Sequence, residues 1–149
     1  MNTIELKSAY EAAYHKPATD IFFSPCRVNL IGEHTDYNGG FVFPCALSFG
    51  TYLLIAPNNE QKMNLRSLNV EAVYSLELSQ LTTPLPDKAW ANYPIGVFAQ
   101  FIKRGVAITQ GYDLSFWGNV PAGAGLSSSA AMEVVTASAL NELLGTGYD

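Results

Sequence analysis

The sequence predicts an α+β protein, in which helices pack on a β-sheet. Two side-chain patterns indicate this class. Residues 74–79 alternate between apolar and polar side chains, which is typical of a strand with one face in water. Residues 90–102 repeat large apolar side chains at intervals of three and four, which is typical of one face of a helix. Hydrophobic residues make up 48% of the chain and charged residues only 14%, so there is enough apolar material for a core.

The N-terminal half is expected to contain a short helix followed by strands. Asn2 and Glu5 can form a capping box for a helix that runs through roughly Tyr14, and the Lys-Pro pair at 16–17 ends it. Apolar and β-branched runs then predict strands at 21–23, 28–31, 41–43, 47–56, 63–68 and 73–78. Residues 82–87 include two prolines and are expected to form a loop.

A second helix is expected over about 90–102. Pro94 is compatible with it only in the first turn, and Gly105 is a suitable C-terminal stop. Periodicity alone favours core packing for Trp90 and Tyr93 on the apolar face of this helix.

The last helix, predicted over 127–144, should be buried on most sides. Its only charged residues are Glu133 and Glu142, and most other positions are Ala, Met, Val or Leu. The sequence contains no internal repeat, low-complexity tract or linker, so residues 1–149 are predicted to form a single domain.

Glycines and serines gather between a strand-like segment at 112–117 and the last helix. Gly123 and Gly125 allow the backbone to approach a ligand closely. Three serines at 127–129 follow at the helix start, where free N–H groups and the helix dipole favour an anion. An ordinary serine N-cap would need only one of them, and no lysine follows as in the Walker pattern. The segment therefore predicts a phosphate-binding loop made of backbone amides and hydroxyls.

A cluster of charged and polar side chains lies within residues 23–39. Arg27 belongs to an apolar strand-like run, and Glu33, His34 and Asp36 follow in the loop where this run ends. Unpaired charges in apolar surroundings are costly, so these groups need partners. The spacing leaves two interpretations open. One is a structural salt-bridge cluster, and the other is a site for a polyhydroxylated ligand, whose hydroxyls bind carboxylates and imidazole in fixed directions.

Together these segments resemble the galactokinases, within the GHMP family of small-molecule kinases. Residues 23–39 match the galactokinase signature, and residues 121–130 match the family's phosphate-binding loop. Between them, Trp90-Ala-Asn-Tyr93 followed by Gly96-Val97 is similar to the galactokinase segment that opens a helix near the nucleotide. The resemblance runs over nearly the whole chain. The signature is highly specific, whereas the glycine-serine loop alone would indicate only the wider family.

The resemblance implies a GHMP N-terminal domain over residues 1–149, with helices on a mixed sheet and the phosphate loop near 119–130. Galactokinases are more than twice as long as this chain, so we expect the C-terminal domain to be absent. The motif that carries their proposed catalytic Asp is absent too, and the fragment alone is expected to be inactive. The usual glycine before Arg27 is replaced by Cys26, whose side chain can crowd the strand or the sugar pocket.

The implied activity belongs to the full-length protein: transfer of the γ-phosphoryl group of ATP to the anomeric hydroxyl of galactose, with Mg²⁺. Arg27 would be catalytic and would stabilise the charge of the transition state. Glu33, His34 and Asp36 would bind the sugar hydroxyls. The residues expected to bind ATP are Trp90, Gly123, Gly125, Leu126, Ser127, Ser128 and Ser129, and Ser129 is also the expected Mg²⁺ ligand.

Two other functions stay open for the full-length protein: a galactose sensor without turnover, and a kinase for a related sugar such as N-acetylgalactosamine. The net charge of −5 argues against nucleic-acid partners. The N-terminus has no apolar signal region and no run approaches 18 apolar residues, so no membrane association is expected. Cys26 and Cys45 are interpreted as free thiols of a cytoplasmic protein. No feature of the sequence predicts an oligomeric state.

Overall fold

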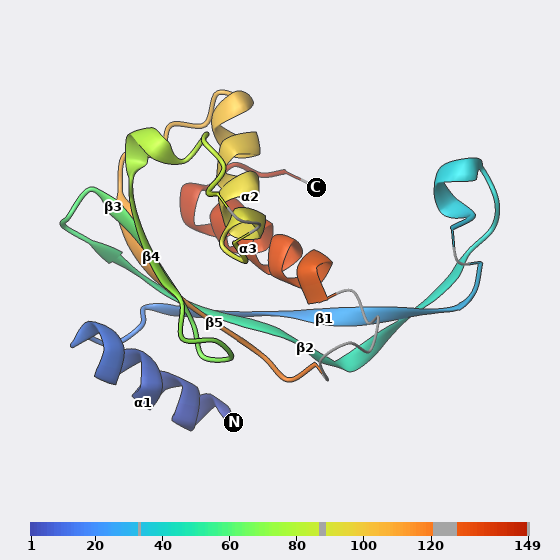
Figure 1. The fold of residues 1–149 in the computed structure, drawn as a ribbon, viewed down its shortest axis with the longest axis horizontal. Coiled ribbons are helices and arrows are strands. Elements are labelled where there is room, and N and C mark those ends of the chain that lie inside the picture. Colours follow the sequence, from blue (N-terminus) through green and yellow to red (C-terminus); the bar gives the residue numbers. More distant parts are fainter. Residues whose placement is uncertain (33, 87–88, 121–127, 149) are drawn as a thin grey trace.

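The backbone forms a mixed sheet with helices on both faces, as the computed structural model shows for residues 1–32, 34–86, 89–120 and 128–148 (Figure 1). The elements are α1 (Thr3–Tyr14), β1 (Asp20–Ile31), η1 (Asp36–Asn38), β2 (Phe43–Asn58), β3 (Lys62–Ser67), β4 (Val73–Glu77), η2 (Leu78–Gln80), α2 (Asn92–Lys103), β5 (Gly111–Gly118) and α3 (Ser128–Leu144). The α+β class is confirmed.

The sheet has the strand order β1-β2-β5-β3-β4. All neighbouring strands are antiparallel except β3 and β5, which are parallel. The parallel pair arises because the chain passes through β4 and α2 before β5 enters the sheet beside β3. This topology places the end of β5 next to the middle of β2, where Thr51 pairs with Gly118.

The two faces of the sheet carry different helices (Figure 1). Successive side chains of a strand point to opposite faces. In β2, Leu53 and Ile55 therefore join the large core beneath α2 and α3, while Leu54 and Ala56 join a smaller cluster with α1. All four side chains are at most 2% exposed. The sheet is thus the middle layer of a three-layer domain.

The expected capping box at the start of α1 is confirmed. The Asn2 side chain accepts hydrogen bonds from the backbone N–H groups of Ile4 and Glu5, and the Glu5 carboxylate accepts one from the Asn2 backbone. The helix ends at Tyr14, followed by His15 in the left-handed conformation. The helix therefore has the bounds predicted from its caps.

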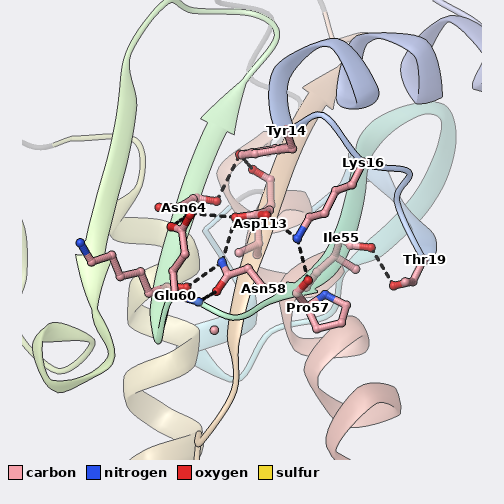
Figure 2. A network of polar contacts seen from close by, with 12 residues as sticks. Tyr14, Lys16, Thr19, Ile55, Pro57, Asn58, Glu60, Asn64 and Asp113 are labelled. Atoms are coloured by element: carbon pink, nitrogen blue, oxygen red, sulfur yellow. Dashed lines mark hydrogen bonds and ion pairs between the residues drawn. The ribbon is translucent and has the colours of Figure 1, made fainter.

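A polar network joins α1 and the following loop to β5 (Figure 2). The Tyr14 hydroxyl donates to the Leu114 carbonyl over 2.8 Å, and the Lys16 ammonium lies 2.6 Å from the Asp113 carboxylate. Asn58 and Asn64 each donate to the same carboxylate over 2.8 Å. The network holds the N-terminal segment against the strand that leads into the glycine-serine segment.

The first two strands are longer than their sequence patterns indicate. The expected strands at 21–23 and 28–31 form one strand, β1, and those at 41–43 and 47–56 merge into β2 from Phe43 onward. Pro25 does not end β1, because an edge strand tolerates a residue without an N–H donor. The pairing instead becomes irregular between Pro25 and Arg27.

Beyond this irregularity, β1 and β2 continue as a two-stranded arm. β5 pairs with β2 only as far as Thr51, so residues 27–31 and 43–46 pair only with one another among the described residues. The arm extends from the body and ends in η1 (Figure 1). Large apolar side chains are exposed along it, including Ile31 at 72% and Phe43 at 62%.

Two expectations for the helices are corrected. α2 begins at Asn92, so Trp90 precedes it, and the buried residues of α2 are Pro94, Ile95, Phe98 and Phe101. The Asn92 side chain anchors this start, because it donates to the Leu85 carbonyl and accepts from the Leu85 N–H.

The last helix is likewise less buried than we expected. Only one face of α3 packs on the sheet and α2, and Val134 on another face is 57% exposed. An apolar composition indicates that a helix can be buried, but it does not identify the elements that pack on each face. None of the helices in the described ranges is long and apolar enough to cross a membrane.

Candidate functional site

The tip of the arm is a loop tied together by Thr35. The Thr35 hydroxyl donates to the Gly32 carbonyl over 2.6 Å and lies 3.0 Å from the Phe41 carbonyl oxygen. Its own carbonyl accepts from the Gly40 N–H over 2.8 Å. Gly32 has φ +98°, and a Cβ there would meet the Phe41 carbonyl oxygen at 2.5 Å. The loop therefore requires a glycine at 32, and a single threonine connects its two ends.

His34 lies exposed on this loop in a defined orientation. Its backbone is left-handed, with φ 59°, and its carbonyl accepts a hydrogen bond from the Asn38 side chain over 2.9 Å. The imidazole Nδ1 is 2.8 Å from the Tyr37 hydroxyl. The ring is therefore held by polar contacts, although it is not buried.

The other two predicted sugar residues are only partly described. Glu33 lies outside the described residues. Asp36 is the first residue of η1, but its side chain is outside the described part. Arg27 forms none of the ion pairs found among described groups. A salt-bridge cluster and a ligand site at residues 23–39 therefore both stay predictions.

Arg27 lies beside the start of α3. It lines a pocket of about 220 Å³ between β1 and that helix, together with Ser24, Pro25, Ala130, Ala131 and Val134. The Arg27 side chain is exposed, so its guanidinium is available to a ligand. The structure thus brings the predicted catalytic cation to the helix that follows the glycine-serine segment.

A larger cavity of about 540 Å³ lies on the other side of this helix start. Its lining residues come from the sheet and the loops that follow β3 and β5, from the segment around the start of α2, and from α3: Thr51, Ser67, Asn69, Val70, Trp90, Tyr93, Phe116, Gly118, Val120, Ser128, Ser129 and Met132. The volume is within the range of small-molecule sites. Trp90, Ser128 and Ser129 were all predicted to bind ATP, and the structure places them around one cavity.

Trp90 offers an unused donor in this region. Its ring packs edge-to-face on Phe116 and Tyr74, and its indole Nε1 is buried without a hydrogen-bond partner among the described residues. A buried donor without a partner is costly. Core packing and a ligand role are therefore both compatible with Trp90, because the ring packs while the N–H has no partner in the described part of the chain.

The phosphate loop itself is described only at its ends. Gly123, Gly125, Leu126 and Ser127 lie outside the described residues. Ser128 and Ser129 open the 17-residue α3, where the first N–H groups lack helical partners and attract anions.

Two asparagines that sequence analysis missed hold the entry to this loop. Asn69 donates to the Gly118 carbonyl and accepts from its N–H, and the Asn119 side chain accepts from the Gly50 N–H over 2.8 Å. These three hydrogen bonds join segments that are 49 and 69 residues apart in sequence, so no local pattern could have revealed them.

The described residues contain no group of three His, Cys, Asp or Glu side chains that could hold a metal ion. Mg²⁺ binds few protein ligands when it also binds phosphate oxygens and water. Ser129, which lines the larger cavity, fits such a role together with a bound nucleotide.

Cys26 is buried at the irregular part of β1, at 1% exposure. Burial raises the pKa of its thiol and so disfavours the reactive thiolate. Both cysteines are free thiols, as predicted.

The sequence matches known families in two segments. Residues 8–57 match the family described as galactokinase galactose-binding signature, and residues 92–149 match the GHMP kinases N terminal domain. A galactokinase of Clostridium beijerinckii is 49% identical over 140 residues, which cover 93% of this chain and 36% of that protein.

Solved structures of kinases are similar to this chain as well. The crystal structure of Lactococcus lactis galactokinase complexed with galactose superimposes with a TM-score of 0.90 at 33% identity, over 98% of this chain and 38% of that one. Methanococcus jannaschii mevalonate kinase has a TM-score of 0.77 at 19% identity, over 87% of this chain and 42% of that one, and so shares the fold. The chain therefore spans little more than a third of the length of the galactokinases that it matches.

Proposed function

Because the chain belongs to the galactokinase family of GHMP kinases, we propose that the full-length protein transfers the γ-phosphoryl group of ATP to the anomeric hydroxyl of galactose. The product is galactose 1-phosphate. The proposal concerns a protein of the length of its relatives, since this chain covers 36% of the Clostridium beijerinckii galactokinase. The 149 residues alone are proposed to be inactive, because they would form only part of the site.

One observation carries the proposal: the start of α3 lies between the two cavities. Ser128 and Ser129 line the cavity that contains Trp90, while Ala130 and Ala131 line the pocket that contains Arg27. A nucleotide whose base occupied the larger cavity would have its phosphates at the N-terminus of α3. The guanidinium of Arg27 would then lie on the other side of the phosphate groups.

Arg27 is the proposed catalytic residue. Catalysis of phosphoryl transfer mainly requires that the protein position the reactants and supply positive charge around the transferring group. An exposed guanidinium beside the helix start can do this with several N–H donors in a fixed geometry. It would also favour the ionised form of a neighbouring acid.

The nucleotide is proposed to bind with its base near Trp90 and its phosphates at the helix start. Gly123, Gly125, Leu126 and the serines at 127–129 would contact the phosphates through backbone N–H groups and hydroxyls. Ser129 would be the hydroxyl ligand of Mg²⁺, which supplies charge neutralisation of the phosphates when it is bound.

The sugar is proposed to bind at the arm tip through Glu33, His34 and Asp36. The match to a galactose-binding signature over residues 8–57 supports this assignment. Polar groups that would be left unpaired by the wrong epimer can give strong discrimination between sugars. The free thiols Cys26 and Cys45 support a reducing compartment such as the cytoplasm.

The test is an assay of the purified full-length protein with ATP, Mg²⁺ and either galactose or N-acetylgalactosamine. We expect galactose 1-phosphate, and we expect Arg27→Met to lower kcat strongly while galactose binding persists. Arg104→Met is the matched control, because Arg104 lies beyond α2 against the ring of Tyr148 and not in either cavity. Galactose binding without turnover would indicate a sensor, and a preference for N-acetylgalactosamine would indicate the related kinase. Either result would refute the proposal.

A further inference from the structure

Tyr37 is an exposed aromatic residue whose hydroxyl contacts a proposed sugar ligand. Its Oη lies 2.8 Å from Nδ1 of His34, and the two rings meet edge to face with centroids 6.0 Å apart. Tyr37 is 72% exposed. An aromatic ring so far out of the core adds little to stability by burial, so its position beside His34 needs another explanation.

The backbone of the loop holds both members of the pair in place. His34 has the left-handed conformation with φ 59°, which is uncommon for residues other than glycine. The Asn38 side chain donates to the His34 carbonyl and the Asn38 N–H donates to the Thr35 carbonyl, so these two hydrogen bonds close the turn that contains Tyr37. The contact therefore connects two side chains that the loop has already oriented.

The chemistry of the two groups decides the direction of the hydrogen bond. A neutral imidazole has one N–H donor and one bare nitrogen acceptor. A phenol, with a pKa of about 10, is a stronger acid than a neutral imidazole N–H, and a bare imidazole nitrogen is a stronger base than a phenol oxygen. The Tyr37 hydroxyl is therefore the donor and His34 Nδ1 the acceptor, which leaves the imidazole proton on Nε2.

We propose that Tyr37 is a positioning residue that acts through His34. By donating to Nδ1, it fixes the tautomer in which Nε2–H points away from the pair as a directed donor. This inference rests on the proposed role of His34 in sugar binding. The ligand that fits is a sugar hydroxyl that accepts a hydrogen bond. The other tautomer would present an acceptor at Nε2 instead.

The first experiment observes the tautomer directly in the 149-residue chain. Long-range ¹H–¹⁵N NMR spectra, recorded well above the ordinary histidine pKa of about 6.5, distinguish protonated from bare ring nitrogens. The chain has two histidines, so His15 is an internal reference. We expect Nδ1 of His34 to be bare and Nε2 to be protonated. In Tyr37→Phe, the two nitrogens of His34 should shift toward a mixture of tautomers while those of His15 stay unchanged.

The second experiment measures galactose in the full-length protein. Tyr37→Phe should raise the Kd and the KM for galactose about fivefold, the effect of one hydrogen bond of ordinary strength, with kcat and the KM for ATP unchanged. Tyr148→Phe is the matched control, since Tyr148 is also exposed and its hydroxyl bonds no group among the described residues. It should leave all of these constants unchanged.

The outcomes separate this inference from the proposed function. Identical His34 spectra in the wild type and Tyr37→Phe, or a protonated Nδ1, would overturn the inference. So would a shifted tautomer with unchanged galactose affinity in a protein whose His34→Ala variant loses affinity. If His34→Ala also binds galactose normally, the sugar role of His34 fails and the inference fails with it. A full-length protein that binds no galactose at all would refute the proposed function.

Discussion

Replacing Asp113 with Asn should destabilise the protein far more than a surface substitution would. The Asp113 side chain is only 7% exposed and lies 2.6 Å from the Lys16 ammonium, and it accepts hydrogen bonds from Asn58 and Asn64 (Figure 2). An amide at position 113 would offer one acceptor oxygen to three donors, and its NH₂ group would face another donor.

The expected loss follows from these contacts. Removing one partner of a buried ion pair typically costs 3–5 kcal/mol. The Lys16 side chain is 31% exposed, so its ammonium can recover some hydration, and we expect a loss of about 3 kcal/mol. Lys16→Met should cost less, because the carboxylate keeps its two amide donors. The double variant should be less destabilised than the sum of the two single variants, since the second substitution removes a group that has already lost its partner.

Urea unfolding followed by circular dichroism measures these losses at constant m value. The pair Lys62–Glu77 is the matched control, because it joins the same charge types over 3.3 Å with side chains 41% and 54% exposed. Glu77→Gln should change stability by about 0.5 kcal/mol or less. A loss below about 1 kcal/mol in Asp113→Asn, or additive single variants, would refute the role assigned to the network.

The same carboxylate predicts a dependence of stability on pH. Burial alone would raise the pKa of Asp113, but the hydrogen bonds from Lys16, Asn64 and Asn58 outweigh it and hold the pKa below its ordinary value of 3.8. The unfolded chain therefore binds a proton at higher pH than the folded chain. The stabilisation that the ionised Asp113 gives the folded protein is complete above the ordinary pKa of 3.8. It is lost as the pH falls through the lower pKa that Asp113 has in the folded protein. Asp113→Asn should lack this pH-dependent part of the folding free energy. If wild type and Asp113→Asn lost the same stability on acidification, Asp113 would not be its source.

Three further substitutions test the scaffold and the site. Gly50→Ala should destabilise the protein by about 1–3 kcal/mol in urea unfolding, because a Cβ there overlaps the Ser24 carbonyl oxygen across the β1–β2 pair. Thr35→Val keeps the side-chain shape but removes the hydroxyl that ties the tip, so galactose affinity in the full-length protein should fall about fivefold without loss of stability. Trp90→Phe removes the buried Nε1, which has no hydrogen-bond partner among the described residues. It should weaken ATP binding about fivefold in a calorimetric titration and leave galactose binding unchanged.

Each of these has a control within the chain. At Gly96 in α2 an added Cβ meets nothing within 4 Å, so Gly96→Ala should be neutral or stabilising, and equal effects at both glycines would rule out the steric argument. Thr35→Ser retains the hydroxyl and should bind galactose normally. If Trp90→Phe bound ATP with unaltered affinity, the proposed contact between Trp90 and the nucleotide would be refuted.

The sequence alone determined the features that depend on neighbouring residues. The box formed by Asn2 and Glu5 predicted the start of α1, and Gly105 marked the end of α2 with φ +88°. The alternation around Leu76 predicted β4. Such signals are readable because caps and periodicity act over a few residues. The order of motifs also predicted the family.

Only the tertiary structure decided the features that depend on strands and helices meeting across the chain. The sequence predicted separate strands at 21–23 and 28–31, yet pairing with β2 joins them into the single strand β1. Lys16 looked like part of a helix stop, but it reaches Asp113 in a strand almost one hundred residues later. Arg27 lies beside Ala130 for the same reason, because β1 and the start of α3 meet on one face of the sheet. These contacts depend on sheet order, and no local pattern encodes the order in which distant strands pair.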